Sequence, residues 1–405
     1  MHRKGLNIIF VLLSVFCFLS SADAKIYIDI TDPGVRQIPL KITTEGSPYA
    51  QEVEWIVKSD LEQTGMFVFV APGAPGAEVA ANINAEPSER LKIVLTVTDL
   101  VENKEVLKKR YDASKPSFRA VAHAAANDIY KAMSGQEGIF RTKLSCLVNV
   151  RPGRKELHIM DWDGYNSRKV VSEGLMPSHI WSPDGSYIAY SSERKRGWGI
   201  YKLDLDSYME SVVFSSEGLN LVGSASPGGL ISFSSSKDGS SEIYILDPSN
   251  KKLKKLTRTY GIDVSPVFSP DGMKIAFVSD TGGSPQIYVM NSDGSGRPQR
   301  ITFEGNYNTS PAWSPDGRSI TFAGRSNGKN QIFVVKSDGK DLRQLTNSGN
   351  NEGPSFSPDG YFIAFDSDRD GMRGIYVMRA NGEAQKRITP KSVNAVSPRW
   401  SPYFK

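Results

Sequence analysis

The sequence predicts an all-β, six-bladed β-propeller of the WD40-like type behind a small α/β domain, and two independent repeating markers carry that prediction. The first marker is the aromatic residue of a Trp-Ser-Pro-Asp-Gly motif or a variant of it, which recurs every 43 to 45 residues. Its positions, counting a degenerate copy that holds Ala, are Trp181, Ala225, Phe268, Trp313, Phe356 and Trp400. The second marker is a ring in a later strand-like run of each unit, again 43 to 45 residues apart, at His158, Tyr201, Tyr244, Tyr288, Phe333 and Tyr376. Both markers give six units with the length of a four-stranded propeller blade.

The repeated Ser-Pro-Asp-Gly stretch has the chemistry of a type I turn. Pro at the second turn position supplies the fixed φ that this turn needs, and Ser at the first and Gly at the fourth position are preferred there. We therefore expect the motif to join the first two strands of each blade. The Trp or Phe before it is large enough to fill the wedge between neighbouring blades.

The order of the strand-like runs predicts how the ring closes. The first unit begins with its second strand, "TKLSCLVNV", whereas the last element is a lone first strand, "SPRWSPYF". Six complete blades result only if residues 397–404 complete the first blade, within a propeller that spans 140–405. Such closure removes the open sheet edges that would otherwise invite aggregation.

Residues 25–134 mix strand and helix patterns and predict the α/β domain, with 135–139 as the linker. Pro48 suits the first position of a helix that ends at Gly65, and apolar residues recur at helical spacing between them. Alternating runs before and after this helix predict strands, and a second helix is expected from about Ser117.

The N-terminal stretch 1–24 has the features of an export signal. A positively charged start precedes the apolar stretch Leu6–Leu19, which is too short for a good membrane span, and small residues follow at Ala22–Ala24. We expect cleavage between Ala24 and Lys25 and an exported, soluble product.

Composition argues against several kinds of partner. The formal net charge of +5 is spread along the chain without a long basic run, so nucleic acid is not expected as a partner. No other apolar run reaches the ~20 residues of a membrane helix, so we expect no direct membrane insertion. We also expect a monomer. Cys146 would be the one cysteine of the mature chain, so it cannot form an internal disulfide.

Catalytic and metal chemistry is not expected. A serine hydrolase would need a strained Gly-x-Ser-x-Gly elbow, which we do not expect here, and the histidines His123, His158 and His179 are interpreted as structural. The stretch Asp366–Gly371 resembles the start of a calcium loop, but Val377 stands where the Glu of the twelfth position is needed. We interpret this stretch as a hairpin turn and expect no enzyme activity and no cofactor. Weak calcium binding stays open as the alternative.

A polar residue stands five positions before the repeated aromatic in four units and six positions before it in the last unit. These residues are Asn220, Asp263, Asn308, Asn351 and Asn394. They fall in loops that lead into the innermost strands, so the loops surround one mouth of the propeller channel. Two interpretations stay open: the side chains shape turns, or they form a ring of hydrogen-bonding groups that grips a loop of a partner.

Taken together, these features resemble the TolB family, the periplasmic propeller proteins of the Tol–Pal system. The resemblance covers the whole chain: the export signal, the α/β domain, the linker region Ser134–Leu144, "MDWDGYN" at Met160–Asn166, the repeats and the terminal "SPRWSPYF". The eroded first strand at Gly223–Gly229 departs from the pattern, because it lacks the aromatic.

The resemblance implies a periplasmic, non-enzymatic protein with two partners. It implies that the peptidoglycan-associated lipoprotein Pal binds at the propeller, and the polar ring at the channel mouth is the candidate site. It implies that TolA receives the mature N-terminal segment, Lys25, Ile26, Tyr27, Ile28, Asp29 and Ile30. Such a protein supports outer-membrane integrity and invagination during cell division. The alternatives are a propeller related to prolyl-oligopeptidase-like hydrolases and another periplasmic ligand-binding propeller.

Overall fold

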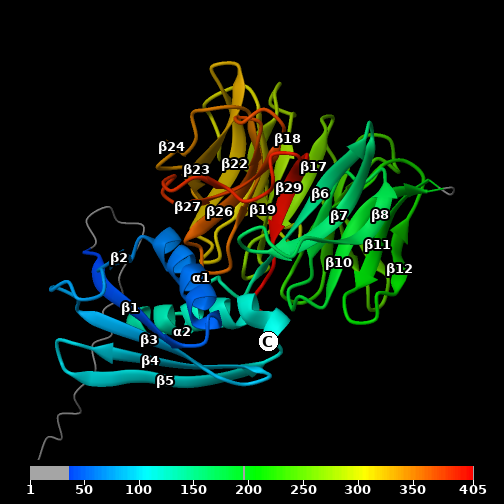
Figure 1. The fold of residues 1–405 in the computed structure, drawn as a ribbon. Coiled ribbons are helices and arrows are strands. Elements are labelled where there is room, and N and C mark those ends of the chain that lie inside the picture. Colours follow the sequence, from blue (N-terminus) through cyan, green and yellow to red (C-terminus); the bar gives the residue numbers. More distant parts are fainter. Residues whose placement is uncertain (1–35, 195–196, 405) are drawn as a thin grey trace, which may run out of the picture.

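The computed structural model describes residues 36–194 and 197–404, which form two domains (Figure 1). A five-stranded sheet with two helices is followed by six four-stranded sheets, so the predicted α/β domain and six-bladed propeller are confirmed. The predicted signal peptide 1–24, its cleavage site between Ala24 and Lys25, and the segment 25–30 lie outside the described residues.

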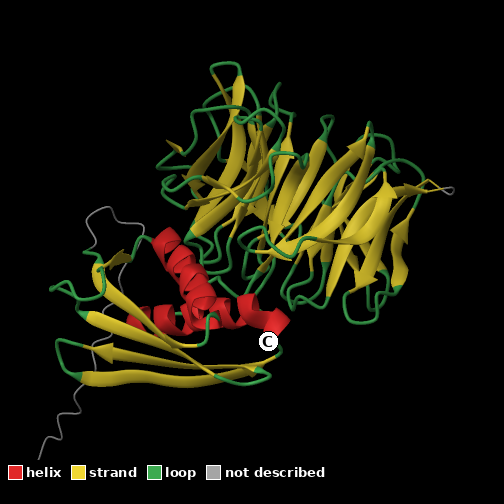
Figure 2. Ribbon diagram, viewed as in Figure 1, coloured by secondary structure: helices red, strands yellow, loops and turns green. Residues whose placement is uncertain are grey.

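The N-terminal domain is a sheet covered on one face by helices (Figure 2). Its elements are β1 (Ile38–Gly46), α1 (Tyr49–Thr64), β2 (Phe67–Phe69), β3 (Val79–Glu86), β4 (Leu91–Asp99), β5 (Lys104–Ala113), the 3-10 turn Lys115–Ser117 and α2 (Phe118–Ser134). The strands pair in the order β2-β1-β3-β4-β5. Alternate residues of β3 and β4, such as Ile83 and Leu95, are buried because one face alone is covered. Within the described ranges, no helix has both the length and the apolar character needed to cross a bilayer.

The propeller consists of six antiparallel sheets, whose strands we name A to D from the channel outward. Blade 1 contains β29 (Ala395–Trp400), β6 (Lys143–Arg151), β7 (Arg154–Asp161) and β8 (Arg168–Gly174), and blade 2 contains β9 (His179–Trp181), β10 (Tyr187–Arg194), β11 (Gly197–Asp204) and β12 (Glu210–Ser215). Blade 3 contains β13 (Asn220–Ala225), β14 (Ile231–Ser235), β15 (Glu242–Asp247) and β16 (Lys252–Lys255), and blade 4 contains β17 (Asp263–Phe268), β18 (Lys274–Ser279), β19 (Gln286–Asn291) and β20 (Gln299–Arg300). Blade 5 contains β21 (Asn308–Trp313), β22 (Ser319–Ser326), β23 (Lys329–Lys336) and β24 (Arg343–Gln344), and blade 6 contains β25 (Asn351–Phe356), β26 (Phe362–Ser367), β27 (Gly374–Arg379) and β28 (Lys386–Arg387).

The ring is closed by β29, which is the A strand of blade 1. It pairs antiparallel with β6, with Trp400 opposite Leu144 (red and green strands in Figure 1). The strand covers Ala395–Trp400 and not the expected 397–404. The reason is local: Ser401 N–H makes the last bond to this edge, and Pro402 has no N–H to continue the ladder.

The repeated aromatics fill the wedges between blades, as the sequence predicts. The indole Nε1 of Trp181 donates to the Arg399 carbonyl of blade 1, and that of Trp313 donates to the Val267 carbonyl of blade 4, each at 3.1 Å. Each Trp therefore joins its own A strand to the A strand of the preceding blade. In the Ser-Pro-Asp-Gly turns, the Gly N–H donates to the Ser carbonyl, which is the bond expected for this turn.

The degenerate A strand of blade 3 has a packing reason for its glycine. A Cβ placed on Gly223 would lie 2.0 Å from the carbonyl oxygen of Pro266 in the next blade. No larger residue fits there without moving the neighbouring backbone. The erosion of the motif therefore coincides with a close approach of two blades.

The N-terminal domain packs on the end of the propeller that carries the A–B turns and C–D hairpins. Gln63, at the end of α1, donates to Ala384 O (2.8 Å), and Arg379 Nε donates to Gln63 O (3.0 Å). Arg119 of α2 forms an ion pair with Asp163, in the C–D hairpin of blade 1. The opposite end, with the D–A loops and B–C hairpins, lies outside these contacts.

Replacing Trp400 by Ala tests the closure. This side chain is 7% exposed, its Nε1 donates to Thr142 Oγ1 (2.7 Å), and its ring centroid lies 6.5 Å from that of Phe362. We expect Trp400→Ala to lower the free energy of unfolding by about 3–5 kcal/mol, measured by denaturant titration. The control is Phe303→Ala, because Phe303 is 70% exposed and its loss should change stability by less than about 0.5 kcal/mol. Equal stability of Trp400→Ala and the wild type would show that β29 does not close the ring.

Candidate partner-binding face and channel

The D–A loops and B–C hairpins share one end of the propeller, because adjacent strands of a blade are antiparallel. We call this end the open mouth. The sequence predicts that the polar ring lies at this end of the propeller, and the structure places its residues at this end. Asn220, Asp263, Asn308 and Asn351 are the first residues of the A strands of blades 3 to 6.

The side chains of these four residues nevertheless point into the propeller wall. All four residues are at most 2% exposed. Asn351 Nδ2 donates to Gln331 Oε1 of blade 5 (2.8 Å) and to Ser348 O (3.0 Å). Asn308 Nδ2 makes the equivalent bond to Gln286 Oε1 of blade 4 (2.8 Å). For these side chains the structure favours the turn-shaping interpretation, since their polar atoms tie each D–A loop to the preceding blade.

Asn220 repeats this bond to the preceding blade, whereas Asp263 and Asn394 do not. Asn220 Nδ2 donates to the Trp198 carbonyl of blade 2 (3.0 Å), and Asp263 accepts a bond from Thr259 of its own loop (3.1 Å). Asn394 is only half-buried and accepts a bond from Asn149 Nδ2 (3.0 Å). It lies in a shallow depression beside the B–C hairpins of blades 1 and 6. Of the five predicted ring residues, Asn394 is therefore the one that reaches the surface of the mouth.

The surface of the open mouth is instead formed by exposed apolar side chains that sequence reasoning missed. We call them the apolar crown: Tyr260, Ile262, Phe303 and Tyr307 in D–A loops, and Val150 and Met372 in B–C hairpins. Tyr260 is fully exposed and Phe303 is 70% exposed. Exposed apolar groups gathered on one face mark an interaction surface in soluble proteins. The sequence did contain a sign of this surface, because aromatic residues occur in the turn-rich stretches "TYGID" and "FEGNYN".

The central channel is a cavity of about 310 Å³ lined by the A-strand segments of all six blades. Three serines in its wall, Ser265, Ser310 and Ser397, have positive φ (54° to 55°), a conformation that non-glycine residues rarely adopt. Each precedes a proline at a β-bulge of its A strand. The bulges turn these serine positions toward the channel.

Blade 6 supplies a buried carboxylate to the channel. Asp366 is 2% exposed, accepts a bond from Ser397 N–H (2.8 Å) and pairs with Arg373 Nη1 (2.9 Å). Burial raises the pKa of Asp366 to about 7, although Arg373 opposes the shift.

The candidate calcium loop does not gather its carboxylates. Asp366 faces the channel, Asp368 accepts bonds from the backbone N–H (2.7 Å) and Nδ2 (3.0 Å) of Asn350, and Asp370 accepts one from the Tyr376 hydroxyl (2.5 Å). The three side chains therefore serve three different partners. This arrangement fits the B–C hairpin that the sequence predicts and not a converging ligand set.

A buried ionic cluster lies between the domains. His123 Nδ1 lies 2.7 Å from Asp60 Oδ2, and its Nε2 lies 3.7 Å from Asp163 Oδ2, which also pairs with Arg119. Burial lowers the pKa of His123, but the bond to Asp60 and the two carboxylates outweigh burial and raise it. The carboxylates face opposite nitrogens of one ring, so the imidazole bridges them. One ligand atom from each of the three residues lies within 4.8 Å of the others.

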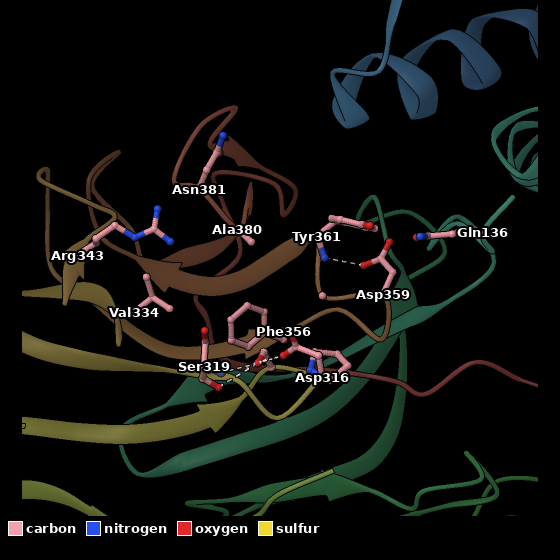
Figure 3. A pocket seen from close by; sticks show the side chains of 13 residues that line it. Gln136, Asp316, Ser319, Val334, Arg343, Phe356, Asp359, Tyr361, Ala380 and Asn381 are labelled. Atoms are coloured by element: carbon pink, nitrogen blue, oxygen red, sulfur yellow. Dashed lines mark hydrogen bonds between the residues drawn. The ribbon is translucent and has the colours of Figure 1, made fainter. Parts of the chain in front are cut away.

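A second cavity, of about 550 Å³, lies at the domain boundary between Gln136 and blades 5 and 6 (Figure 3). Its carboxylates are held by their own turns: Tyr361 N–H donates to Asp359 Oδ1 (3.0 Å), and Ser314 Oγ donates to Asp316 (2.5 Å). The described residues that line it include no histidine. The cavity therefore does not contain the Ser–His pair of a hydrolase.

The Gly-x-Ser-x-Gly spacing, which we did not expect, does occur at Gly324–Gly328. It lies in the hairpin between β22 and β23, where Asn327 and Gly328 have positive φ. Asn-Gly with two positive φ angles is typical of a type I′ hairpin turn, whereas a nucleophile elbow joins a strand to a helix. The spacing here results from turn chemistry.

Comparison with known proteins gives one consistent family. Residues 130–404 match a family model described as the TolB beta propeller domain. The chain is 31% identical over 322 residues to the protein TolB homolog of Chlorobium luteolum, covering 72% of this chain and 73% of that protein. It is 29% identical over 311 residues to the Tol-Pal system protein TolB of Bordetella pertussis, covering 70% of each. The crystal structure of TolB from Acinetobacter baumannii superposes with a TM-score of 0.81 at 26% identity, covering 91% of this chain and 98% of that one.

The raised pKa of Asp366 predicts a pH dependence of stability. Between pH 4 and 7 the folded protein retains a proton that the unfolded chain has released, so stability falls as pH rises through this window. Asp366→Asn cannot bind or release this proton, so the fall in stability with rising pH should be absent in the variant. We expect the unfolding free energy of the variant, relative to the wild type, to rise between pH 5 and 8 by up to about 1.4 kcal/mol per pH unit.

Asp368→Asn in the same hairpin is the matched control. Its burial is offset by the bonds from Asn350, which hold the pKa of Asp368 below its ordinary value. Its effect on stability should therefore be constant between pH 5 and 8. A flat difference for Asp366→Asn as well would mean that Asp366 is ionised throughout this range.

Proposed function

The chain belongs to the TolB family, and on that premise we propose that it is a non-enzymatic, periplasmic protein of the Tol–Pal system. The observation that carries this proposal is the family match over 130–404, together with a relative that is named as a Tol-Pal system protein. Export would follow from the signal peptide, with cleavage after Ala24. The role would be to support outer-membrane integrity and invagination during cell division.

The proposed docking site for Pal, the peptidoglycan-associated lipoprotein, is the open mouth. Three observations support it. The apolar crown lies on this end, the channel runs through its centre, and the N-terminal domain packs on the opposite end. The buried ring residues Asn220, Asp263, Asn308 and Asn351 would act by holding the D–A loops in shape, and Asn394 would contact the partner directly.

The proposed attachment for TolA is the segment Lys25, Ile26, Tyr27, Ile28, Asp29 and Ile30. It precedes β1 in the chain and lies far in sequence from the propeller. The two partners would then use separate parts of the molecule. A mutation can then abolish binding of one partner and leave binding of the other unchanged.

The absence of catalysis is part of the proposal, and the buried Ser–His contact found among residues 36–194 and 197–404 supports it. Ser145 Oγ lies 2.9 Å from His179 Nε2, but both residues are at most 1% exposed. His179 Nδ1 has no hydrogen-bond partner in the described chain, whereas a triad histidine needs a carboxylate there. Burial lowers the pKa of His179 to about 3. A neutral, inaccessible imidazole without an orienting acid cannot serve a hydrolase.

Removing the two most exposed crown aromatics tests the docking site. We expect Tyr260→Ala combined with Phe303→Ala to weaken binding of the Pal periplasmic domain at least tenfold in calorimetric titration, because aromatic anchors dominate interface energies. The melting temperature should not change, since both side chains are exposed. Trp55→Ala on α1 is the control, with a similarly exposed aromatic on the other domain. Wild-type affinity of the double variant would move the Pal site away from the crown.

Asn351→Ala should lower the stability of the protein more than its affinity for Pal, which is the reverse of the crown variant. Loss of the Asn351 side chain removes one hydrogen bond that Gln331 Oε1 accepts and one that Arg369 Nη2 donates, although both residues keep other partners, so we expect stability to fall by about 0.5–1.5 kcal/mol. Affinity for Pal, measured at a temperature where the variant stays folded, should fall less than in the crown variant. A larger loss of affinity with unchanged stability would instead assign Asn351 to the interface.

Deleting Lys25–Thr31 tests the proposed TolA segment. We expect the deletion to abolish binding of the TolA periplasmic domain and to leave Pal binding unchanged or stronger, because no crown residue is touched. Both affinities can be measured on the same sample by sequential titration. A deletion that still binds TolA would show that the segment is only structural.

A further inference from the structure

The channel contains more positive than negative side chains. Lys155, Arg373 and Arg399 line it together with two carboxylates, Glu352 and Asp366. Arg373 pairs with both carboxylates, at 3.1 Å from Glu352 and 2.9 Å from Asp366. The acidic groups are thereby engaged by one cation, and two cations remain.

Neither remaining cation has a carboxylate partner in the described chain. Arg399 Nη1 donates to two neutral carbonyls, Pro398 O (2.9 Å) and Gly353 O (3.5 Å). The backbone of Lys155 is paired within blade 1, but its ammonium group makes no hydrogen bond or close ion pair with any described residue. Burial lowers the pKa of both groups, and the nearby charge of Asp366 opposes this shift only in part.

Lys155 and Arg399 line the same cavity of about 310 Å³. After burial, the charges of Arg399 and Lys155 also lower the pKa of the buried His179 imidazole. His179 stays neutral and adds no charge of its own. The serine positions Ser178, Ser265 and Ser310 complete a polar wall around this region.

We propose that Lys155 and Arg399 form an anion-binding subsite in the channel, which takes the carboxylate of an acidic side chain on a loop that the docked partner inserts. The inference rests on the proposed function, because it deepens the same docking site. A guanidinium fork beside a compact ammonium charge suits a carboxylate, and charge-assisted bonds of this kind are the strong ones. The cavity of about 310 Å³ lies on the propeller axis, at the end of the molecule that carries the crown, so a loop of a partner docked there can enter it.

Lys155→Met tests the subsite, because it keeps the length of the side chain and removes its charge. We expect the affinity for the Pal periplasmic domain to fall at least tenfold, and the dependence of this affinity on salt to become weaker. The melting temperature should stay equal or rise, since an uncompensated charge is lost. Lys340→Met is the matched control, because Lys340 is exposed in the C–D hairpin of blade 5, at the other end of the propeller. Lys155→Gln repeats the test if the Met variant does not fold.

Inorganic phosphate distinguishes a free anion from a carboxylate carried by the partner. At constant ionic strength, phosphate should compete with Pal for the wild type, and it should not affect the weaker binding to Lys155→Met. If phosphate raises the melting temperature of the wild type alone while Pal binds both proteins equally, the subsite serves a free anion and the partner-borne carboxylate is wrong. If Pal does not bind the wild type at all, the proposed function fails, and the phosphate result still decides whether the subsite exists. Equal behaviour of wild type and variant toward both probes would overturn the inference.

Discussion

The ladder between β29 and β6 joins the two ends of the propeller, and the other inter-blade contacts depend on it. An open array of six sheets would leave the inner edge of β6 without a partner, and exposed edges are sites of aggregation. Closure also fixes the spacing of the wedges. Trp181 can donate to the Arg399 carbonyl only when β29 is in place, so the first wedge of the ring is built on the last strand. The channel exists because all six A strands are held at once.

The need to satisfy buried polar groups explains why the open mouth has two kinds of residue. The first residue of an A strand is buried between blades, so its side chain must find a partner inside the wall. The carboxamides of Asn308 and Asn351 find it in a Gln of the preceding blade, Gln286 and Gln331. The loop residues beside them carry exposed aromatics such as Tyr260 and Phe303. Buried polar groups and exposed apolar groups thus occupy neighbouring positions of one loop.

The sequence was sufficient for the parts of the molecule that depend on local chemistry. The Ser-Pro-Asp-Gly turn and its aromatic are set within a few residues, so blade number, strand order and ring closure could all be predicted. The sequence could also place Asn220, Asp263, Asn308 and Asn351 at the start of the A strands, but it could not predict the directions of their side chains. Asn351 is bonded to Gln331, 20 residues earlier, and the spacing of a single residue type does not reveal such a partner. The crown was missed because its aromatics do not recur at one position of the repeat. The channel charges were missed because Lys155 and Arg399 meet only after the ring closes.

The pairing that closes the ring also sets an order of events for a chain that emerges from its N-terminus. Thr142 and Trp400, which bond across the seam, are separated by 258 residues. Contacts with so large a sequence separation form late, because the entropy of closing the intervening loop must be overcome first. Until then β6 is an unprotected edge beside a finished α/β domain, and any chain that reaches it in the correct register can occupy the place of β29. The folding intermediate that precedes closure is therefore the species most exposed to strand exchange between copies, and a chaperone that shields one strand edge would protect the whole propeller.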